Sequence, residues 1–313
     1  MRVLVTGAAG FVGGHALTEL RRAGHEVVAT VLPGQTDQVP GAIATVGVDL
    51  VDADGMARLF SSHTPDAVLH LAGMAFVPMA WDQPQAAFQI NTIGTINVLE
   101  AARRHTPNAR LLAVTSAQLY GHQPRPTAIR EDDPPSADNL YALTKWSADA
   151  ATRMYAARYG LHAMTARPCN HIGPGQSESF VVSAFARQLI AIANGKQPSV
   201  MKVGNLASQR EFTDVRDTVR AYRLLLEKGR TGCAYNVATG ALTTIQALFD
   251  RLCAIVGVAP EITIDPALYR PTDSQPILDT SRILEHVGWR PEIPIETTLR
   301  DVVEDFRQRI ARG

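Results

Sequence analysis

The stretch VTGAAGFVGGHALTELRRAG, residues 5–24, constrains the fold more than any other part of the sequence. Gly7, Gly10 and Gly13 stand here between an apolar run and an amphipathic helical pattern. A tight turn from strand to helix needs positive φ, and a backbone that approaches a pyrophosphate closely tolerates no Cβ. The N–H groups that open the helix favour negative charge. The GxxGxxG spacing therefore predicts a dinucleotide-binding turn, although glycines at such positions can also serve the turn alone.

Apolar runs of strand length alternate with longer helical patterns through the first half of the chain. The runs are RVLVT (2–6), EVVATV (26–31), AVLHLAG (67–73) and ARLLAVTS (109–116). Strand and helix in this order imply right-handed crossovers and a parallel sheet. We therefore expect an α/β fold with a Rossmann-type doubly wound sheet in residues 1–166. Proline and glycine then break the rhythm, so residues 167–313 are expected to form mainly a smaller C-terminal lobe, with some segments returning to the sheet.

The composition narrows the classes of partner. Thirty basic residues balance thirty acidic ones, so no net charge attracts nucleic acid or an anionic membrane. No apolar run approaches the ~18 residues that cross a bilayer, and the first residues lack a signal-peptide pattern, so we expect a cytoplasmic protein. Cys169, Cys233 and Cys253 are odd in number and widely spaced, which argues against disulfides and against a metal site.

The segment NLYALTKW places Tyr141 and Lys145 four residues apart, on one face of a predicted helix. A phenol with a pKa of about 10 is a poor acid–base catalyst at neutral pH, but an adjacent ammonium group favours its ionised form. Ser116 ends the strand LLAVTS, at the carboxyl edge where ligands bind in such sheets. We interpret the three residues as catalytic, although Ser116 could also be a cap.

The ends of the second and third strands give weaker signals. The second strand ends in TVLP, residues 30–33, without the acid that binds a ribose 2′-hydroxyl and without an arginine, so NAD and NADP are not distinguished. Asp49, in VGVDL, follows a short apolar stretch that could be a third strand. Its spacing fits a loop cap and an acceptor for adenine equally well.

The glycine turn (Gly7, Gly10, Gly13) together with Ser116, Tyr141 and Lys145 resembles the extended short-chain dehydrogenase/reductase superfamily. The resemblance covers essentially the whole chain. HLAG (70–73), NTIGTINVLEA (91–101), TSAQLYG (115–121) and YNVATG (235–240) match motifs that recur in it. In the second half, ARPCNHIGPGQSESFV and VGNLASQREFTDVRD resemble the branch that acts on nucleotide sugars, above all the GDP-4-keto-6-deoxymannose reductases. GDP-mannose 4,6-dehydratases are the near relatives.

The resemblance implies an NAD(P)H cofactor and a nucleotide-diphosphate sugar as substrate. It assigns cofactor binding to Gly7, Gly10, Phe11, Val12, Gly13, Asp49, Leu50, Leu71, Ala72, Gly73, Asn91, Tyr141, Lys145 and Pro168. The second lobe would bind the nucleotide sugar, and the candidate residues are Gln118, Asn170, Arg210 and Arg270.

Elementary chemistry supports that choice of substrate residues. The guanidinium forks of Arg210 and Arg270 suit phosphate oxygens, although each arginine could instead form a surface ion pair. Asn170 can donate a hydrogen bond from a loop that proline and glycine stiffen. His171, in the same loop, is interpreted as structural or as a substrate contact.

Gln118 decides between the two related reactions. Dehydratases of the superfamily carry an acid two residues before the tyrosine of YG, and this sequence has Gln118 there, preceded by Ala117. An amide cannot take up the proton that elimination of water releases. The resemblance then implies reduction of the C4 keto group of a nucleotide-linked 4-keto-6-deoxy sugar, with GDP-4-keto-6-deoxymannose giving GDP-rhamnose.

Other functions stay open at this point. A nucleotide-sugar 4-epimerase would use the same residues without net redox, and the dehydratase follows it. A non-catalytic NAD(P)-sensing regulator is a remote alternative, since fold alone does not imply catalysis. Two long helical patterns, 83–104 and 139–159, resemble the helices that related proteins pair across a two-fold axis, so a homodimer is expected.

Overall fold

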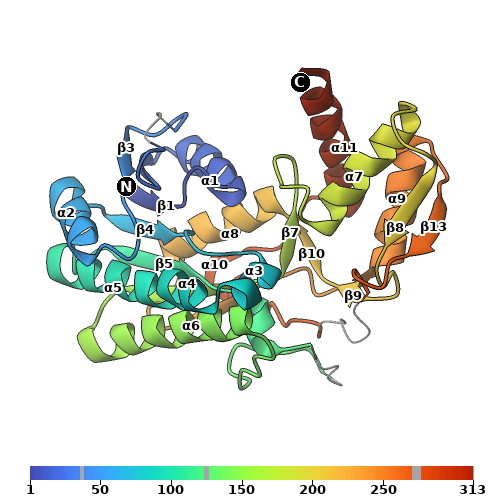
Figure 1. Ribbon diagram of the computed structural model, residues 1–313. Helices are drawn as coiled ribbons and strands as arrows, with labels where there is room; N and C mark the ends of the chain where they lie inside the picture. The colour runs from blue at the N-terminus through green and yellow to red at the C-terminus, as the bar shows by residue number, and fades with distance from the viewer. Residues whose placement is uncertain (36–38, 123–126, 270–275, 313) are drawn as a thin grey trace.

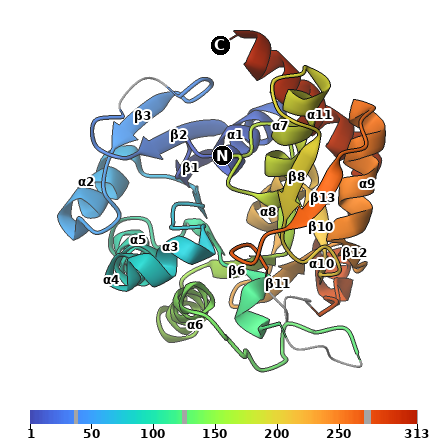
Figure 2. The same ribbon diagram turned by 45° about the vertical axis from the view of Figure 1, so that its right-hand side comes forward.

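Seven parallel strands form the centre of the protein. The computed structural model describes residues 1–35, 39–122, 127–269 and 276–312. Its main sheet has the order β11-β6-β5-β4-β1-β2-β3, of which β1, β3, β4 and β5 are labelled in Figure 1 and β2, β6 and β11 in Figure 2. The strands are β1 (Arg2–Thr6), β2 (Glu26–Val31), β3 (Ala44–Gly47), β4 (Ala67–His70), β5 (Arg110–Val114), β6 (Ala163–Pro168) and β11 (Ala234–Val237). The expected Rossmann-type sheet is confirmed, and it includes a third strand just before Asp49.

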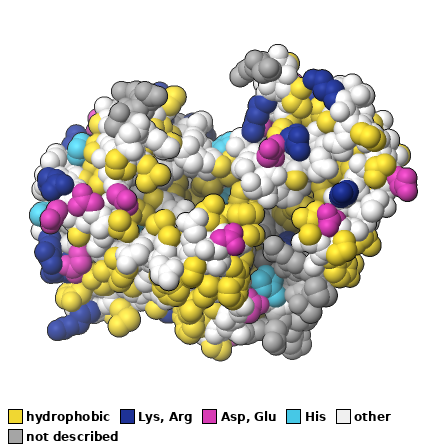
Figure 3. All heavy atoms as spheres, in the orientation of Figure 1, with side chains coloured by type: hydrophobic (Ala, Val, Ile, Leu, Met, Phe, Trp, Pro, Cys, Tyr) yellow, Lys and Arg dark blue, Asp and Glu magenta, His cyan; other side chains and the backbone are white. Residues whose placement is uncertain are grey.

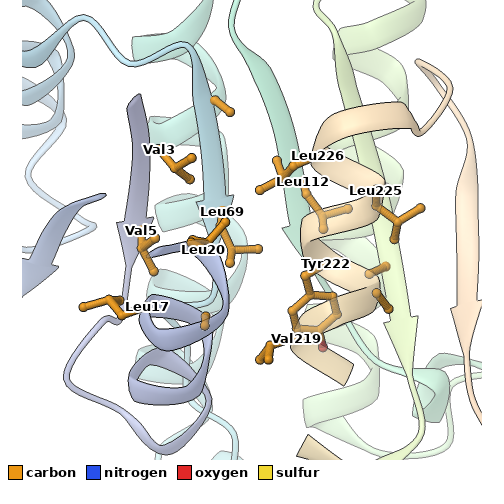
Figure 4. Close-up of a cluster of buried hydrophobic side chains, with 14 of the residues drawn as sticks. Val3, Val5, Leu17, Leu20, Leu69, Leu112, Val219, Tyr222, Leu225 and Leu226 are labelled. Carbon is orange, nitrogen blue, oxygen red and sulfur yellow. The ribbon is translucent and has the colours of Figure 1, made fainter. Parts of the chain in front are cut away.

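Helices cover both faces of this sheet. One face carries α1 (Phe11–Arg22), α8 (Val215–Lys228) and α10 (Ser281–Val287). The other carries α2 (Ala53–His63), α5 (Gly94–His105) and α6 (Leu140–Tyr159). Figure 4 shows Leu17 and Leu20 of α1 beside Val5 of β1, with Tyr222 of α8 in the same cluster. Burial on both faces explains why the strands read as continuous apolar runs instead of alternating ones.

The second lobe has a hydrophobic core of its own. Its helices are α7 (Val181–Ala193), α9 (Ile245–Val256) and α11 (Ile295–Arg312), which lie together in Figure 2. Three two-stranded sheets complete it: β7 (Asn170–Ile172) with β10 (Phe212–Asp214), β9 (Gln209–Arg210) with β12 (Thr243–Thr244), and β8 (Val200–Val203) with β13 (Glu261–Ile264). Figure 3 shows the surface hollowed between the two parts of the molecule. The boundary at residue 166 stays a prediction.

The two long helices expected from the sequence differ in regularity. Helix α6 runs without a break, from the cap of Asn139 to Gly160, whose φ of 68° ends the helix in the left-handed region. The segment 83–104 instead contains α4 (Pro84–Phe88), a π-helical turn (Gln89–Ile93) and α5, and the short helix α3 (Val77–Asp82) precedes it. A π turn inserted into an α-helix often marks a functional position.

In the described part of the chain, no helix combines the length and the apolar character that a membrane crossing requires. The cytoplasmic location stays a prediction. Cys169, Cys233 and Cys253 are free thiols, the first buried and the other two half-buried.

Candidate active site

The glycine turn between β1 and α1 leaves no room for a side chain at Gly7 or at Gly13. Gly7 has a φ of +69°, and a Cβ on it would lie 2.9 Å from the backbone of Ala72. A Cβ on Gly13 would lie 2.4 Å from the carbonyl oxygen of Ala8. Gly10 precedes the first helical residues, Phe11 and Val12, and has no side chain that could cap the N–H groups of the first turn. The turn therefore fits a phosphate group that accepts these hydrogen bonds.

Other predicted cofactor residues lie at the carboxyl ends of strands in the main sheet. Leu71, Ala72 and Gly73 come directly after β4, and Pro168 ends β6. Asp49 and Leu50 follow β3 at the far side of the sheet, where Asp49 Oδ1 accepts a hydrogen bond of 3.0 Å from the N–H of Val51. This contact is the loop role considered for Asp49, and its role toward adenine stays a prediction.

Ser116, Tyr141 and Lys145 are all buried, each with about 7% of its surface exposed. Asn139 caps α6, since its Oδ1 accepts a 2.9 Å hydrogen bond from the N–H of Ala142, and this sets the register in which Tyr141 and Lys145 share a face. Ser116 caps the short 3₁₀ turn Ala117–Tyr120 through a 3.2 Å hydrogen bond from the N–H of Gln118. The cap role and the candidate catalytic role of Ser116 therefore coexist.

Burial shifts the pKa of both titratable residues of this group. It raises the pKa of Tyr141, and a hydrogen bond with Ser116 acts in the opposite direction. Burial lowers the pKa of Lys145 from 10.5 to about 8. The Lys145 ammonium donates a 3.2 Å hydrogen bond to the carbonyl oxygen of Val114, and a Cβ on Gly73 would lie 3.1 Å from its Nζ. At neutral pH the phenol is protonated and the amine is charged.

Asn91 lies inside the π-helical turn and connects it to two other segments. Its Oδ1 accepts a 2.8 Å hydrogen bond from the N–H of Met74, and its Nδ2 donates to the carbonyl oxygen of Met74 at 3.2 Å. Nδ2 also donates to Thr144 Oγ1 at 2.9 Å, next to Lys145 in α6. The predicted cofactor residue thus holds the segment after β4 against the helix of Tyr141.

The structure brings most of the predicted substrate residues to the junction of the lobes. Asn170 Nδ2 donates a 3.1 Å hydrogen bond to the carbonyl oxygen of Glu211, the residue after Arg210. Ala117, beside Gln118, lines a cavity of about 10 Å³ together with Cys169 and Glu211. Gln118, Asn170 and Arg210 are half-buried. Arg270 lies outside the described residues, so its predicted role is not placed.

His171 packs against the glycine turn. Its ring stacks on Phe11 with centroids 6.2 Å apart, and its Nδ1 lies 3.3 Å from the carbonyl oxygen of Cys169. Burial, helped by His15, lowers the pKa of His171. A neutral ring stacked between the lobes fits the structural interpretation.

A buried ion pair under the site was missed by the sequence analysis. Arg167 on β6 donates two hydrogen bonds, of 2.9 and 2.7 Å, to the carboxylate of Asp149 on α6. Asp149 shares a helix face with Tyr141 and Lys145, because the three residues are spaced by four. The sequence offered that spacing as a signal, but nothing in it identified the partner of Asp149 on strand β6. Arg167 also donates to the carbonyl oxygen of Glu131 at 2.8 Å, so the pair ties α6 and β6 to the loop that precedes α6.

Known proteins resemble this chain both in sequence and in structure. The chain is 34% identical over 313 residues to the GDP-6-deoxy-D-mannose reductase of Pseudomonas aeruginosa, with 99% of this chain and 98% of that protein covered. It is 29% identical over 320 residues to the UDP-glucose 4-epimerase of Mycolicibacterium smegmatis, with 99% of both covered. A structure of RMD from Pseudomonas aeruginosa complexed with NADPH matches with a TM-score of 0.88 at 34% identity, covering 98% of this chain and 99% of that one.

A family model agrees with these relatives. The sequence model described as GDP-mannose 4,6 dehydratase matches residues 4–302. This match includes the glycine turn, the Tyr141 and Lys145 helix and the second lobe. The chain therefore belongs to the GDP-mannose 4,6 dehydratase family, within the extended short-chain dehydrogenase/reductase superfamily that its motifs resemble.

Proposed function

We propose that this protein reduces the C4 keto group of a nucleotide-linked 4-keto-6-deoxy sugar with NADPH or NADH. The specific substrate is GDP-4-keto-6-deoxymannose and the product is GDP-rhamnose. The observation that carries the proposal is the buried group Ser116, Tyr141 and Lys145 next to an amide, Gln118, where a dehydratase has an acid. The full-length similarity to a GDP-6-deoxy-D-mannose reductase supports the substrate class.

The cofactor would lie along the carboxyl edge of the sheet. The glycine turn fits its pyrophosphate, because the Cβ positions at Gly7 and Gly13 are filled by backbone and the first turn of α1 has N–H groups to donate. The segment Leu71–Gly73, Asn91 and Pro168 would then border the nicotinamide half, and Asp49 with Leu50 the adenine half. When bound, the reduced nicotinamide supplies the hydride that C4 accepts.

The residues of this chain supply the proton and the orientation. Tyr141 would donate a proton to the C4 oxygen, because burial raises its pKa and keeps the phenol protonated at neutral pH. Ser116 would hold the same oxygen through its hydroxyl group. The Lys145 ammonium has three N–H donors, of which one binds Val114, so it can also hold the ribose hydroxyls of the cofactor.

The sugar nucleotide would bind at the junction of the lobes. Asn170 and Arg210 would contact its diphosphate together with Arg270, and the binding energy gained there would orient C4 toward the nicotinamide. We therefore expect the free sugar to lose turnover as well as affinity. Arg210→Ala is expected to weaken the binding of the sugar nucleotide far more than the binding of NADPH, because the phosphates of NADPH would lie at the glycine turn.

The test supplies GDP-4-keto-6-deoxymannose with NADPH or NADH and follows cofactor oxidation together with the mass of the product. A gain of two hydrogen atoms with loss of the reduced cofactor supports the reductase. A parallel sample contains GDP-mannose without NAD(P)H. Conversion of that sample to a 4-keto-6-deoxy product would show that Gln118 does not prevent dehydration and would overturn the proposal.

A nucleotide-sugar 4-epimerase is the second candidate function. The chain is 29% identical to a UDP-glucose 4-epimerase along the full length of both proteins, and an epimerase would use the same three residues. It would also need space in which the keto intermediate can rotate. Interconversion of two C4 epimers without net consumption of NADPH would favour this function over reduction.

We also propose that the protein is a homodimer. The outer face of α6 exposes Leu143 and Met154, with 36% and 68% of their surfaces accessible. Trp81 of α3 and Ile93 of the π-helical turn, two elements that pack against α6, are 58% and 41% exposed. Figure 3 shows hydrophobic side chains over α3 and the start of α6. These exposed apolar side chains support a two-fold bundle in which the segments 83–104 and 139–159 pair with those of a second copy.

A further inference from the structure

His70 is a buried polar residue to which the proposed reaction assigns no role. It ends β4, directly opposite Thr6, which ends β1 just before the glycine turn. Only 3% of its surface is exposed. Its two ring nitrogens contact different parts of the site, so the position of its proton can be worked out from its neighbours.

The Nδ1 side of the ring accepts a hydrogen bond. Thr6 Oγ1 receives two hydrogen bonds of 3.1 Å, from the N–H groups of Leu71 and Ala72. These use both acceptor sites of the hydroxyl group, so its proton must point to His70 Nδ1, which lies 2.7 Å away. Nδ1 therefore carries no proton.

The Nε2 side of the ring donates a hydrogen bond. Thr95 Oγ1 donates its proton to the carbonyl oxygen of Asn91 at 2.7 Å, and His70 Nε2 lies 3.0 Å from the same hydroxyl oxygen. The hydroxyl can only accept from the ring, so Nε2 carries the proton. A charged ring would leave one buried N–H against another donor. Burial and the nearby charge of Lys145 lower the pKa of His70 to about 3, which is consistent with a neutral ring.

The path continues from this histidine to the helix of the catalytic residues. The carbonyl oxygen of Asn91 is taken up by Thr95, while the side chain of Asn91 binds Met74 and Thr144. Thr144 Oγ1 in turn donates a 2.8 Å hydrogen bond to the carbonyl oxygen of Tyr141. One directed series of hydrogen bonds thus joins the end of β1 to α6 through the π-helical turn.

We infer that His70 is a positioning residue: as a neutral ring with its proton on Nε2, it fixes the glycine turn and the Leu71–Gly73 segment relative to Asn91 and α6. This inference rests on the proposed function, because the distance it fixes lies between the cofactor segments and Tyr141 with Lys145. A Cβ on Gly73 would lie 2.8 Å from Asn91 Oδ1 and 3.1 Å from Lys145 Nζ. The Leu71–Gly73 segment is therefore packed closely against Asn91 and α6.

The first experiment reads the tautomer directly and needs no substrate. Uniformly ¹⁵N-labelled histidine is introduced into the full-length protein, whose sequence has nine histidines, and His70→Gln identifies the signal that disappears. The expected ring signals are those of a neutral histidine with a protonated Nε2, unchanged from about pH 5 to 8. A proton on Nδ1, or a ring that titrates in this range, would overturn the inference.

The second experiment removes the hydrogen bond between His70 and Thr95 by changing one residue or the other. His70→Asn can still accept from Thr6 but is too short to reach Thr95, and Thr95→Val keeps the shape of the side chain but removes its hydroxyl group. Thr152→Val is the matched control, because Thr152 is also fully buried and donates to a helix carbonyl, that of Ala148, at 2.8 Å. We expect His70→Asn and Thr95→Val each to lower kcat by about tenfold and to weaken the binding of NADPH. Thr152→Val is expected to keep the wild-type kcat and the wild-type affinity for NADPH.

The double variant separates positioning from general loss of stability. Both single changes break the same link, so His70→Asn combined with Thr95→Val is expected to lose no more than either alone. Single variants that keep wild-type kcat and NADPH affinity while folded, or losses that multiply in the double variant, contradict the inference. NADPH affinity and the histidine signals are measured without any sugar nucleotide, so failure of the proposed substrate is recognised separately from failure of the role of His70.

Discussion

Tyr141 gives the sharpest prediction at the scale of a single residue. Tyr141→Phe removes the proposed proton donor and little of its shape, so turnover should fall by ~10²-fold or more while NADPH and the sugar nucleotide still bind. Steady-state kinetics and fluorescence titration with NADPH measure the two effects. Tyr155→Phe is the control, since Tyr155 is on the same helix but donates to Glu100 at 2.9 Å. Near-normal turnover of Tyr141→Phe would exclude it as the donor.

Lys145 predicts a dependence of stability on pH. Burial lowers its pKa from 10.5 to about 8, so between these values the unfolded chain binds a proton that the folded chain does not. The free energy of unfolding contributed by this residue therefore rises with pH in that window, and below it the buried charge costs about 3 kcal/mol. A substitution of Lys145 that removes this charge also removes its hydrogen bond to Val114, and this loss offsets about 1 kcal/mol of the gain in stability.

Lys145→Met should consequently raise the free energy of unfolding by roughly 2 kcal/mol at pH 7, with a gain that shrinks toward pH 10. Urea unfolding of the cofactor-free protein at several pH values measures this. The exposed Lys196→Met should show no such trend. A variant that is destabilised at pH 7, or a gain independent of pH, would contradict the pKa of Lys145 on which the charge state of the site depends.

At the scale of an element, substitutions of two neighbouring glycines in the first turn of α1 test how closely this helix must pack against β1. A Cβ on Gly13 would lie 2.4 Å from the carbonyl oxygen of Ala8, so Gly13→Ala must push α1 away from β1. We expect at least about tenfold weaker NADPH binding and a lower Tm. Gly14→Ala meets nothing within 4 Å and should instead stabilise the helix by about 1 kcal/mol. Equal cofactor affinity in the two variants would mean that close packing of α1 does not matter for binding.

The elements themselves show where sequence reasoning succeeds and where it stops. Local patterns predicted β1, β2, α1 and α6, because the strands are continuous apolar runs, the helices have apolar positions at helical spacing, and glycines or caps stand near their ends. The π-helical turn Gln89–Ile93 could not be predicted, since it depends on bonds from Asn91 to Met74 and Thr144, which are distant in sequence. The pairing of Arg167 with Asp149 and the proton position on His70 were inaccessible for the same reason.

At the scale of the whole molecule, the proposed dimer predicts the effect of surface charge. Met154→Asp places a carboxylate on the exposed face of α6 and should convert the dimer to a monomer at micromolar concentration, as measured by light scattering. Leu284→Asp is the control, because Leu284 is 52% exposed on α10, which covers the opposite face of the sheet. A wild-type protein that is already monomeric under these conditions would refute the dimer.

The late return of the chain to its main sheet has a consequence for how the protein is made. On the ribosome, β1 to β6 emerge first, but α8 and β11 follow only after residue 214. Until then, the sheet face that carries α1 is not covered by Val219, Tyr222 and Leu225 of α8. The edge of β6 that pairs with β11 is also open. Such unpaired edges and uncovered faces make a nascent chain prone to aggregation. A fragment of residues 1–166 should therefore precipitate or bind chaperones, and NADPH should not rescue it until the missing segments are supplied.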